Sequence, residues 1–412
     1  MNLKLDFLVK EIFIKIITKG LGIFRTLLLL LFFSVSSTLD DFYYAKSIVG
    51  FIILINIFFE ITHSQELNKY KNNPVFVKKY CIILNKLSLI IGIPLIIISF
   101  LIFENSQIMS HIIILSIWAW FNINSNYFLL IFRYKNRNTK VLLYYFLISI
   151  FDILILVLML EYFSLRSDFF AISLSLLFSE LLIFSIIFSK YCFQCLTKTH
   201  STKIETGIKE STLYKVLLIL AFVSLIEISD KFFLSLLGEG LITYYSYGLY
   251  GALMIRQSLD IRSNFFVKIN KSKNIHQTKI IFYDTIKKLI PFFILGVILL
   301  FLLIELFEDV IQNTFHMENI NMFKNIVYLG ALIAPFYMIW DLFYRFYYRE
   351  GQINRLIIMV FLGLIVNVIL NFYLGISLSW GVYGILISTL AVFLFYNILS
   401  YQYFFVNKKN RG

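Results

Sequence analysis

Two basic residues stand inside the first long apolar stretch of the sequence, residues 13–36. If this stretch is a helix, Arg25 lies about 18 Å from its start and Lys19 about 9 Å. A charge at the centre of a bilayer costs at least ~2.5–3.5 kcal/mol, so a cation at that depth is expected to have a function. Guanidinium and ammonium groups bind phosphate oxygens. We therefore predict that Arg25 and Lys19 line a cationic cavity; the alternative is a long helix end that lies in the headgroups.

Acidic residues occur inside the later apolar stretches. Glu227 and Lys231 are four residues apart, so they can pair on one helical face, and Asp230 stands between them in the sequence. These residues form either a neutralised structural pair or the lining of a cavity, in which Lys231 is cationic and a carboxylate binds a coupling cation. Asp152 and Glu180 lie near the midpoints of two other stretches. Each is either a protonatable coupling site or part of an interhelical hydrogen bond.

The remaining charged candidates lie nearer to the ends of apolar stretches. Arg256 is a further candidate for the cationic cavity, although its i,i+4 spacing from Asp260 favours a structural pair. Asp40 and Asp41 follow the first stretch, in a predicted connection where we expect carboxylates to be solvated.

Motifs for enzymatic chemistry and metal binding are sparse. Cys192 and Cys195 form one CxxC, without the second CxxC that a zinc site needs. The sequence contains no GxxxxGK[ST] phosphate loop, no HExxH and no GxSxG. We therefore predict no catalytic residues, no metal, no cofactor and no enzymatic activity.

The composition indicates a membrane protein. Of 412 residues, 59% are apolar and 15% charged, whereas a soluble domain has about 45–50% and about 25%. The apolar stretches have about 20 residues, the length at which a helix crosses about 30 Å of hydrocarbon. We predict an all-α polytopic membrane protein with twelve transmembrane helices. The predicted spans are 13–36, 42–61, 81–103, 108–132, 141–163, 168–190, 213–237, 241–261, 289–307, 325–346, 354–376 and 381–406.

The distribution of Lys and Arg orients these spans. Of the 37 basic residues, Lys46, Arg166 and Lys324 alone lie on one side, and Lys231 lies within a span. The others lie on or beside the opposite connections, counting the N-terminal segment through the first span. Since basic residues mark the cytoplasmic side, we predict cytoplasmic N- and C-termini and a multi-pass location in a bacterial inner membrane. The net charge of +13 then reflects topology and not a nucleic-acid partner.

The spans divide into two halves of six helices. We predict an N-terminal bundle at 1–190, a cytoplasmic linker at 191–212 and a C-terminal bundle at 213–412. A weak echo relates the halves: Lys140 precedes Asp152 by 12 residues, and Arg355 precedes Asn367 by 12. Two six-helix units of the same orientation are parallel repeats, and transporters of that design bind substrate between the halves near the midplane.

Three motifs, in this order, are similar to those of a known superfamily. They are TKGLGIFRT at 18–26 with DDFYYAKSIVGFIILINIFFE at 40–60, SLIEISDKFFLSLLGEGLITYYSYGLYGALM at 224–254, and NVILNFYLGISLSWGVYGILIST at 367–389. The sequence resembles the polysaccharide branch of the multidrug/oligosaccharidyl-lipid/polysaccharide (MOP) exporters, most closely the Wzx-type O-antigen or capsule repeat-unit flippases.

The resemblance implies a MATE-like fold of two six-helix bundles around a central cavity. It also implies a cargo, a polyprenyl-diphosphate-linked oligosaccharide, moved to the outer leaflet by alternating access. Lys19 and Arg25 match basic residues in the first span of the related lipid II flippases, and Asp41 resembles their acidic residue at the outer end. Their basic residue in the eighth span has no counterpart, because Gly251 stands near that place, which favours another glycolipid.

Implied partners are the membrane, a coupling ion that is a proton or sodium, and the polymerase and glycosyltransferases of the same pathway. Two alternatives stay open. A multidrug or cation antiporter of the same fold would use the carboxylates in the spans for cationic substrates. A membrane polymerase or glycosyltransferase is disfavoured by the absence of large loops.

Overall fold

The structure is a computed structural model, and it describes residues 2–70, 74–102, 106–135, 137–161, 170–189, 210–258, 269, 275–315 and 319–406. Within these residues every regular element is a helix. Eight helices in the described part are long and apolar enough to cross a membrane. The chain is therefore a multi-pass, all-helical membrane protein.

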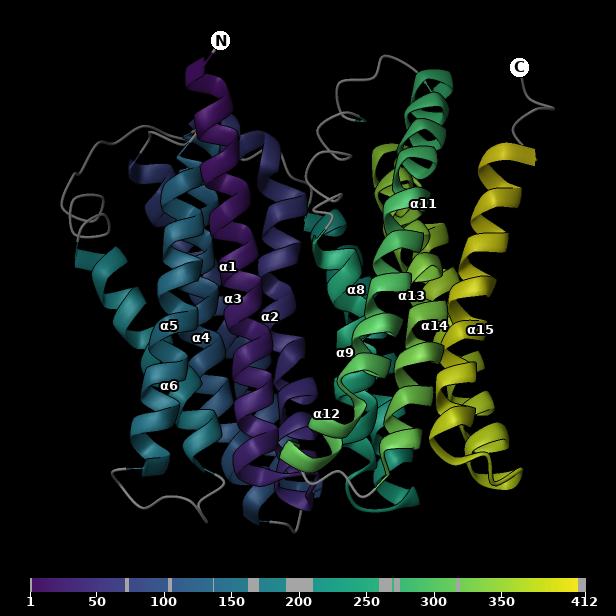
Figure 1. Cartoon of the computed structure of the whole chain (residues 1–412). Helices are drawn as coiled ribbons and strands as arrows, with labels where there is room; N and C mark the ends of the chain where they lie inside the picture. The colour runs from purple at the N-terminus through teal and green to yellow at the C-terminus, as the bar shows by residue number, and fades with distance from the viewer. Residues whose placement is uncertain are drawn as a thin grey trace. The chain divides into compact units, whose positions relative to one another are not determined.

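The chain divides into two compact units. Unit 1 comprises Met1–Phe33 and Asp41–Leu220, and unit 2 comprises Ser34–Asp40 and Ala221–Gly412. The helices of unit 1 (Figure 1) are α1 Asn2–Phe33, α2 Ser37–Tyr70, α3 Pro74–Ile102, α4 Ser106–Tyr134, α5 Asn138–Glu161 and α6 Phe170–Ile187. Boundaries between the units fall inside α2, after Asp40, and inside α8, after Leu220.

In unit 1, α4 and α6 form the packed centre. α6 packs against both α4 and α5, and α5 packs in turn against α1. α4 is the most buried of the unit's apolar spans, and α3 is the least buried. α3 exposes a run of apolar side chains that includes Ile90, Ile97 and Leu101. Such a face needs lipid around it, because water would penalise its exposure.

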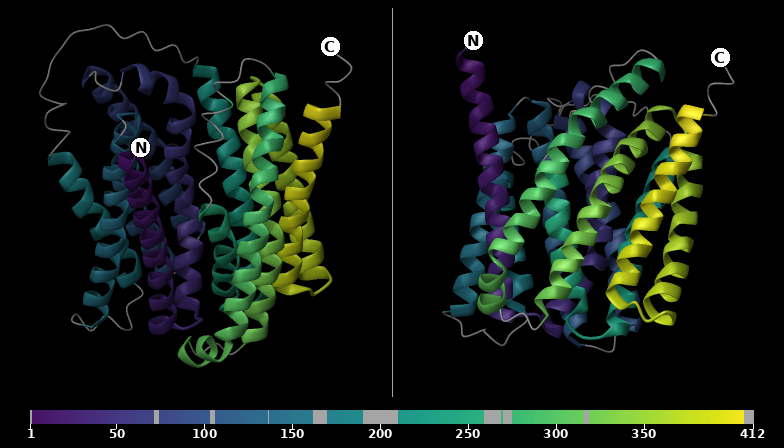
Figure 2. Two further views of the ribbon diagram at one scale, coloured as in Figure 1. Left: turned by 45° about the horizontal axis from the view of Figure 1, so that its top comes forward. Right: turned by 45° about the vertical axis from the view of Figure 1, so that its right-hand side comes forward.

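Unit 2 contains the second set of long helices. Its elements are α8 Glu210–Leu237, α9 Leu241–Ser258, α11 Ile275–Leu306, α12 Glu308–Phe315, α13 Ile320–Arg349, α14 Ile353–Leu370, the π-helical η3 Asn371–Ser377, α15 Gly381–Tyr401 and the π-helical η4 Gln402–Val406. α13 lies at the packed centre, against α9 and α15. The short α12 lies at the end of this unit opposite the C-terminus (Figures 1 and 2).

The two units share a pattern of burial along the chain. The fourth predicted span of each half, α4 and α13, is the most buried of the apolar spans described, and the third, α3 and α11, is the least. The same order of buried and lipid-exposed helices in both units is what an internal repeat would give.

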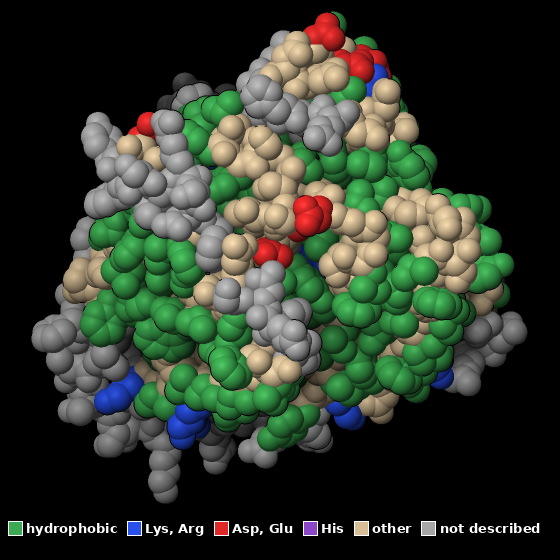
Figure 3. Space-filling view, turned by 90° about the horizontal axis from the view of Figure 1, so that it is seen from below, with side chains coloured by type: hydrophobic (Ala, Val, Ile, Leu, Met, Phe, Trp, Pro, Cys, Tyr) green, Lys and Arg blue, Asp and Glu red, His purple; other side chains and the backbone are tan. Residues whose placement is uncertain are grey.

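Hydrophobic side chains dominate the described surface that is seen end-on in Figure 3. Few acidic side chains lie among them.

Each of the twelve predicted spans overlaps a helix, but several boundaries differ from prediction, and two of these differences move charged residues into helices. The first predicted connection was placed at 37–41, whereas α2 begins at Ser37, so Asp40 and Asp41 belong to its first turns. The ninth predicted span begins at 289, whereas α11 begins at Ile275 and includes basic residues that were assigned to the preceding connection.

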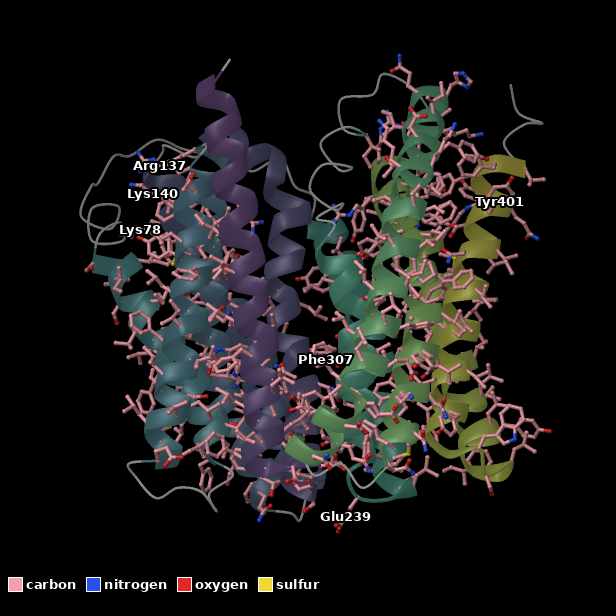
Figure 4. The ribbon with its side chains drawn as sticks, in the orientation of Figure 1. Lys78, Arg137, Lys140, Glu239, Phe307 and Tyr401 are labelled. Atoms are coloured by element: carbon pink, nitrogen blue, oxygen red, sulfur yellow. The ribbon has the colours of Figure 1, made fainter. Side chains whose placement is uncertain are left out.

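The basic residues that were used to predict topology gather at one end of unit 1. Lys78, before the third predicted span, lies at the same end as Arg137 and Lys140, which precede the fifth (Figure 4). Within unit 2, Glu239 lies at the opposite end from Tyr401, which is close to the C-terminus. The side of the membrane on which each end lies stays a prediction.

Candidate functional site

A buried ion pair joins the first and fifth helices of unit 1. Arg25 projects from α1, and its Nε contacts Oδ2 of Asp152 at the middle of α5. The two side chains are 12% and 6% exposed, respectively. The charges compensate each other, which a cation and a carboxylate away from water require. The structure thus brings two predicted site residues, from distant parts of the sequence, into direct contact.

The hydrogen bonding of this pair is incomplete. Nε and Nη2 of Arg25 and Oδ1 of Asp152 are buried, and none of these three atoms has a hydrogen-bond partner among the described residues. Buried polar atoms in native proteins are nearly always hydrogen-bonded, so such exceptions often mark functional positions. The pair therefore has the character of a binding site more than that of a fully satisfied structural bridge.

A second carboxyl group lies beside this pair. Glu180 on α6 is 1% exposed, and its Oε2 accepts a hydrogen bond of 3.0 Å from Nδ2 of Asn122 on α4. Asp152 is close enough for its charge to act on Glu180, and Ser125 also faces the Glu180 carboxyl group. The cluster therefore places one guanidinium group near two carboxyl groups.

A chain of hydrogen bonds continues from Glu180 toward the end of α4. Asn126 donates to Oδ1 of Asn122 at 2.8 Å, and Tyr145 donates to Oδ1 of Asn126 at 2.8 Å. Arg133, in the last turn of α4, reaches the Tyr145 hydroxyl at 3.5 Å. The charge-based search of the sequence missed these neutral residues. The run of asparagines in NINSN, inside a predicted span, was the available signal, because amide side chains in lipid need partners.

Unit 2 contains a different kind of buried carboxylate. Asp230 on α8 is 1% exposed and accepts four hydrogen bonds from neutral donors. Asn367 and Asn371 donate to Oδ1 at 2.9 and 2.8 Å. Tyr245 and Thr389 donate to Oδ2 at 2.7 and 2.9 Å. These donors come from four different elements, so Asp230 ties α8 to α9, α14, η3 and α15.

A close backbone approach holds the amide donors of this site in position. η3 begins at Asn371, and the last helix packs tightly against it. A Cβ at Gly384 would lie 2.6 Å from the carbonyl carbon of Leu374, so only glycine permits this contact. Asn367 and Asn371 are four residues apart, so both face the same carboxylate oxygen from one side of the helix. π-helical turns are rare and are frequent at functional sites.

The predicted pair Glu227–Lys231 forms in the structure. Nζ of Lys231 lies 2.9 Å from Oε1 of Glu227, one turn away on α8. The Lys231 side chain is 7% exposed and that of Glu227 is 62% exposed. Lys231 is therefore neutralised by its own helix, and the two residues act as one unit.

The expectation that Asp40 is solvated is wrong. Asp40 is buried and belongs to unit 2, where its carboxylate accepts hydrogen bonds from the backbone N–H of Gly240 at 2.6 Å and of Thr243 at 2.7 Å. The Thr243 hydroxyl donates a further hydrogen bond of 2.6 Å. Asp40 thereby caps the start of α9, where unpaired N–H groups and the helix dipole favour a negative charge. Asp41, the predicted candidate of the two, is half-buried.

Two predicted cations have side chains outside the described residues. Lys19 lies in α1 and Arg256 in α9, but only their backbones are described. The loop with Cys192 and Cys195 is also outside the described residues, as is Asp260. In the part that the structure describes, no group of three His, Cys, Asp or Glu residues is arranged to hold a metal ion.

Two units of long membrane helices, each with a buried polar site, define a polytopic all-helical membrane protein. Comparison with solved structures gives the same fold. No protein-family model and no curated protein matches the sequence.

Among solved structures, the chain is similar to lipid II flippase MurJ in an inward closed conformation. The TM-score is 0.63 and the identity 18%, over 94% of this chain and 86% of that one. An outward-facing multidrug resistance MATE transporter of the MOP superfamily gives a TM-score of 0.55 at 12% identity, over 96% and 88%. A MATE in the bent conformation gives 0.56 at 14%, over 96% and 88%. At these identities the likeness establishes the fold, which is that of MOP superfamily transporters and flippases.

Proposed function

We propose that this protein is a flippase for polyprenyl-diphosphate-linked oligosaccharide repeat units. It moves them from the cytoplasmic to the outer leaflet by alternating access of its two halves, without breaking a bond. The lipid tail remains in the bilayer, while the polar head crosses through a cavity. The glycan is of the O-antigen or capsule type, as the Wzx-like motifs in the sequence indicate.

The observation that carries this proposal is the unsatisfied guanidinium group of Arg25. A buried arginine with an unused N–H donor is suited to phosphate oxygens, since the planar fork of donors matches two of them. It stands on the first helix of a fold shared with a protein named as a lipid II flippase. Lys19, six residues earlier on the same helix, adds a second cation on the cytoplasmic side.

The same proposal assigns the remaining features. The N-terminal bundle 1–190 and the C-terminal bundle 213–412 rock against each other, joined by the cytoplasmic linker 191–212. Lys231 and Arg256 contribute to the cationic cavity, and Asp41, Glu227 and Asp230 are cavity or coupling carboxylates for a proton or sodium ion. The protein works in a bacterial inner membrane beside the polymerase and glycosyltransferases of its pathway.

A deletion strain of the source bacterium tests this proposal. Polyprenyl-linked oligosaccharides are extracted and identified by mass spectrometry, and surface polysaccharide is assayed in parallel. We expect the deletion to accumulate lipid-linked repeat units and to lose the surface glycan. Wild-type protein should restore both, whereas Arg25→Ala, at equal protein level, should not. A normal surface glycan with an unchanged lipid pool in the deletion strain would contradict the proposal.

A second candidate function is multidrug or cation antiport, which the structure of Asp230 favours. A buried carboxylate surrounded by four neutral oxygen- and nitrogen-bearing side chains is suited to exchange a proton or a small cation. Neighbours of the same fold are named as multidrug resistance transporters. Accumulation of cationic dyes in cells that overexpress wild-type or Asp230→Asn protein separates the two functions, since a glycolipid flippase should leave dye levels unchanged.

A further inference from the structure

The buried pair of Arg25 and Asp152 uses only part of its hydrogen-bonding capacity. A guanidinium group has five N–H donors arranged as a planar fork. Nε of Arg25 contacts Oδ2 of Asp152 as an ion pair, but neither Nε nor Nη2 has a hydrogen-bond partner in the described part of the chain. Oδ1 of Asp152 is buried and equally unpaired among those residues. The carboxylate therefore neutralises the guanidinium group without satisfying the N–H donors at Nε and Nη2.

Among the described residues, the side chains around the pair are acidic or neutral. α6 contributes the carboxyl group of Glu180, which interacts electrostatically with Asp152. α4, packed against α6, contributes the neutral Asn122 and Ser125, which face Glu180. A weak anion is therefore not drawn to Arg25 by the local field. It must exchange places with Asp152.

This exchange selects among anions by charge and shape. A monovalent anion replaces one single-charge contact by another and leaves a buried carboxylate without its cation, which is unfavourable. A diphosphate brings more charge, and several oxygens that fit the guanidinium fork in pairs. The diphosphate can thus engage Nη2 as well as Nε, whereas the Asp152 carboxylate leaves Nη2 unpaired.

We propose that Asp152 is an internal competitor for the anion site at Arg25, and that it admits diphosphates while rejecting weaker anions. This rests on the proposed function, in which Arg25 binds the diphosphate of the cargo, and it adds a residue that determines specificity. In the absence of cargo Asp152 holds the guanidinium group, and on cargo binding the group passes from the carboxylate to the diphosphate.

The carboxylate of Asp230, by comparison, is held by neutral donors and offers no cation to an anion. Its two oxygens accept four hydrogen bonds from neutral side chains. An entering anion has nothing to gain there, because no cation is released. Asp152, in contrast, is held by a cation that an anion can also bind. The two buried carboxylates, one in each unit, therefore differ in kind.

Binding of inorganic diphosphate and of inorganic phosphate to the purified full-length protein tests the proposal. Isothermal titration would compare wild type with Asp152→Asn, Arg25→Gln and the double variant. If Asp152 occupies Arg25 nine-tenths of the time, the apparent diphosphate affinity is reduced about tenfold. We therefore expect Asp152→Asn to tighten diphosphate binding about tenfold or more, and to tighten phosphate binding by at least as much. Arg25→Gln and the double variant should not bind either anion.

Asp309→Asn is the matched control. It also removes one carboxylate, but from an exposed position on α12, so it should leave both affinities unchanged. Equal or weaker diphosphate binding by Asp152→Asn, with binding still lost in Arg25→Gln, would overturn the competitor role and leave the anion site intact. Unchanged binding in Arg25→Gln would overturn the anion site itself. Neither result depends on the deletion strain, which tests flipping separately.

A measurement on wild-type protein keeps the proposal testable if Asp152→Asn does not fold. Infrared difference spectra with and without inorganic diphosphate report the carboxylate stretch of a side chain that loses its cation. We expect a shifted carboxylate band on diphosphate addition, retained in Glu180→Gln and absent in Arg25→Gln. A spectrum without any carboxylate change at saturating diphosphate would overturn the exchange.

Discussion

Two substitutions of Asp230 show whether its hydrogen bonds or its negative charge stabilise the protein. Asp230→Asn keeps the shape of the side chain and removes the charge, whereas Asp230→Ala removes both. Two amide groups, from Asn367 and Asn371, donate to one carboxylate oxygen, and the hydroxyls of Tyr245 and Thr389 donate to the other. In Asp230→Asn the remaining oxygen can face the two amides, while the new amide group donates to the hydroxyls, which can rotate and accept. We therefore expect Asp230→Asn to lose less than about 1 kcal/mol of stability.

In Asp230→Ala the hydrogen bonds of the site cannot be rearranged in this way. The amides of Asn367 and Asn371 cannot become acceptors by rotation of a proton, and each buried unpaired donor costs about 1–3 kcal/mol. The two amides together give a loss of about 2–6 kcal/mol. About 1 kcal/mol shifts the unfolding midpoint by about 2–4 °C in a unit of this size. We expect a fall of at least about 4 °C for Asp230→Ala.

The unfolding midpoints of these variants can be compared by thermal unfolding in lipid nanodiscs at fixed pH, followed by tryptophan fluorescence. Glu239→Ala is the control, because Glu239 is exposed in the turn that precedes α9. We expect wild type, Asp230→Asn and Glu239→Ala to unfold within about 3 °C of one another. An Asp230→Asn protein as unstable as Asp230→Ala would refute the reasoning, since the negative charge and not the sorted hydrogen bonds would then hold the site.

Three further predictions concern positions whose neighbours the structure defines. Asp40→Ala should lower stability by about 2 kcal/mol or more, because it leaves the start of α9 uncapped. Asp41→Ala should lower stability less, and the unfolding midpoints of the two variants test this difference. Gly384→Ala should destabilise by about 1–3 kcal/mol, because its Cβ would lie 2.6 Å from a backbone carbon. In Gly50→Ala the added methyl group meets nothing within 4 Å, so an unchanged or raised midpoint is expected and a drop equal to that of Gly384→Ala would contradict this. Asn122→Ala should cost about 1–3 kcal/mol by removing the amide that donates to the buried Glu180, which denaturant titration measures.

The positions of the buried polar residues could be predicted from the sequence, but their partners could not. The echo between Lys140–Asp152 and Arg355–Asn367 placed a polar residue at the middle of two helices. In the structure Asp152 contacts Arg25, and Asn367 contacts a residue 137 positions earlier. A helical period identifies the face of a helix on which a side chain lies. It does not identify the helix packed against that face.

Asp40 was misjudged because its partner is distant in sequence. A carboxylate beside a predicted connection is usually solvated, and this local rule gave the wrong result. The N–H groups that bind Asp40 belong to a helix 200 residues further along the chain. The glycines at 238 and 240 marked the turn before that helix correctly, and both adopt positive φ angles. The local turn was therefore predictable, while its cap was not.

The asparagines of α4 were overlooked because only charges were weighed against the lipid. Neutral amides are less costly in a membrane than ions, yet they still need partners there. Asn122, Asn124 and Asn126 all found them, on three neighbouring helices or on their own backbone. Counting amides within each predicted span would have located the polar core of unit 1.

The amide-rich α4 also has a consequence for how the chain is inserted into the membrane during synthesis. It is the least apolar of the eight spans, so on its own it has the weakest tendency to leave the translocon for lipid. The partners that its amides have outside α4 are present only when α3, α5 and α6 lie beside it. We expect α4 to enter the bilayer together with the helices that follow it. A nascent chain that ends soon after α4 should then be inserted less completely than one that extends through α6.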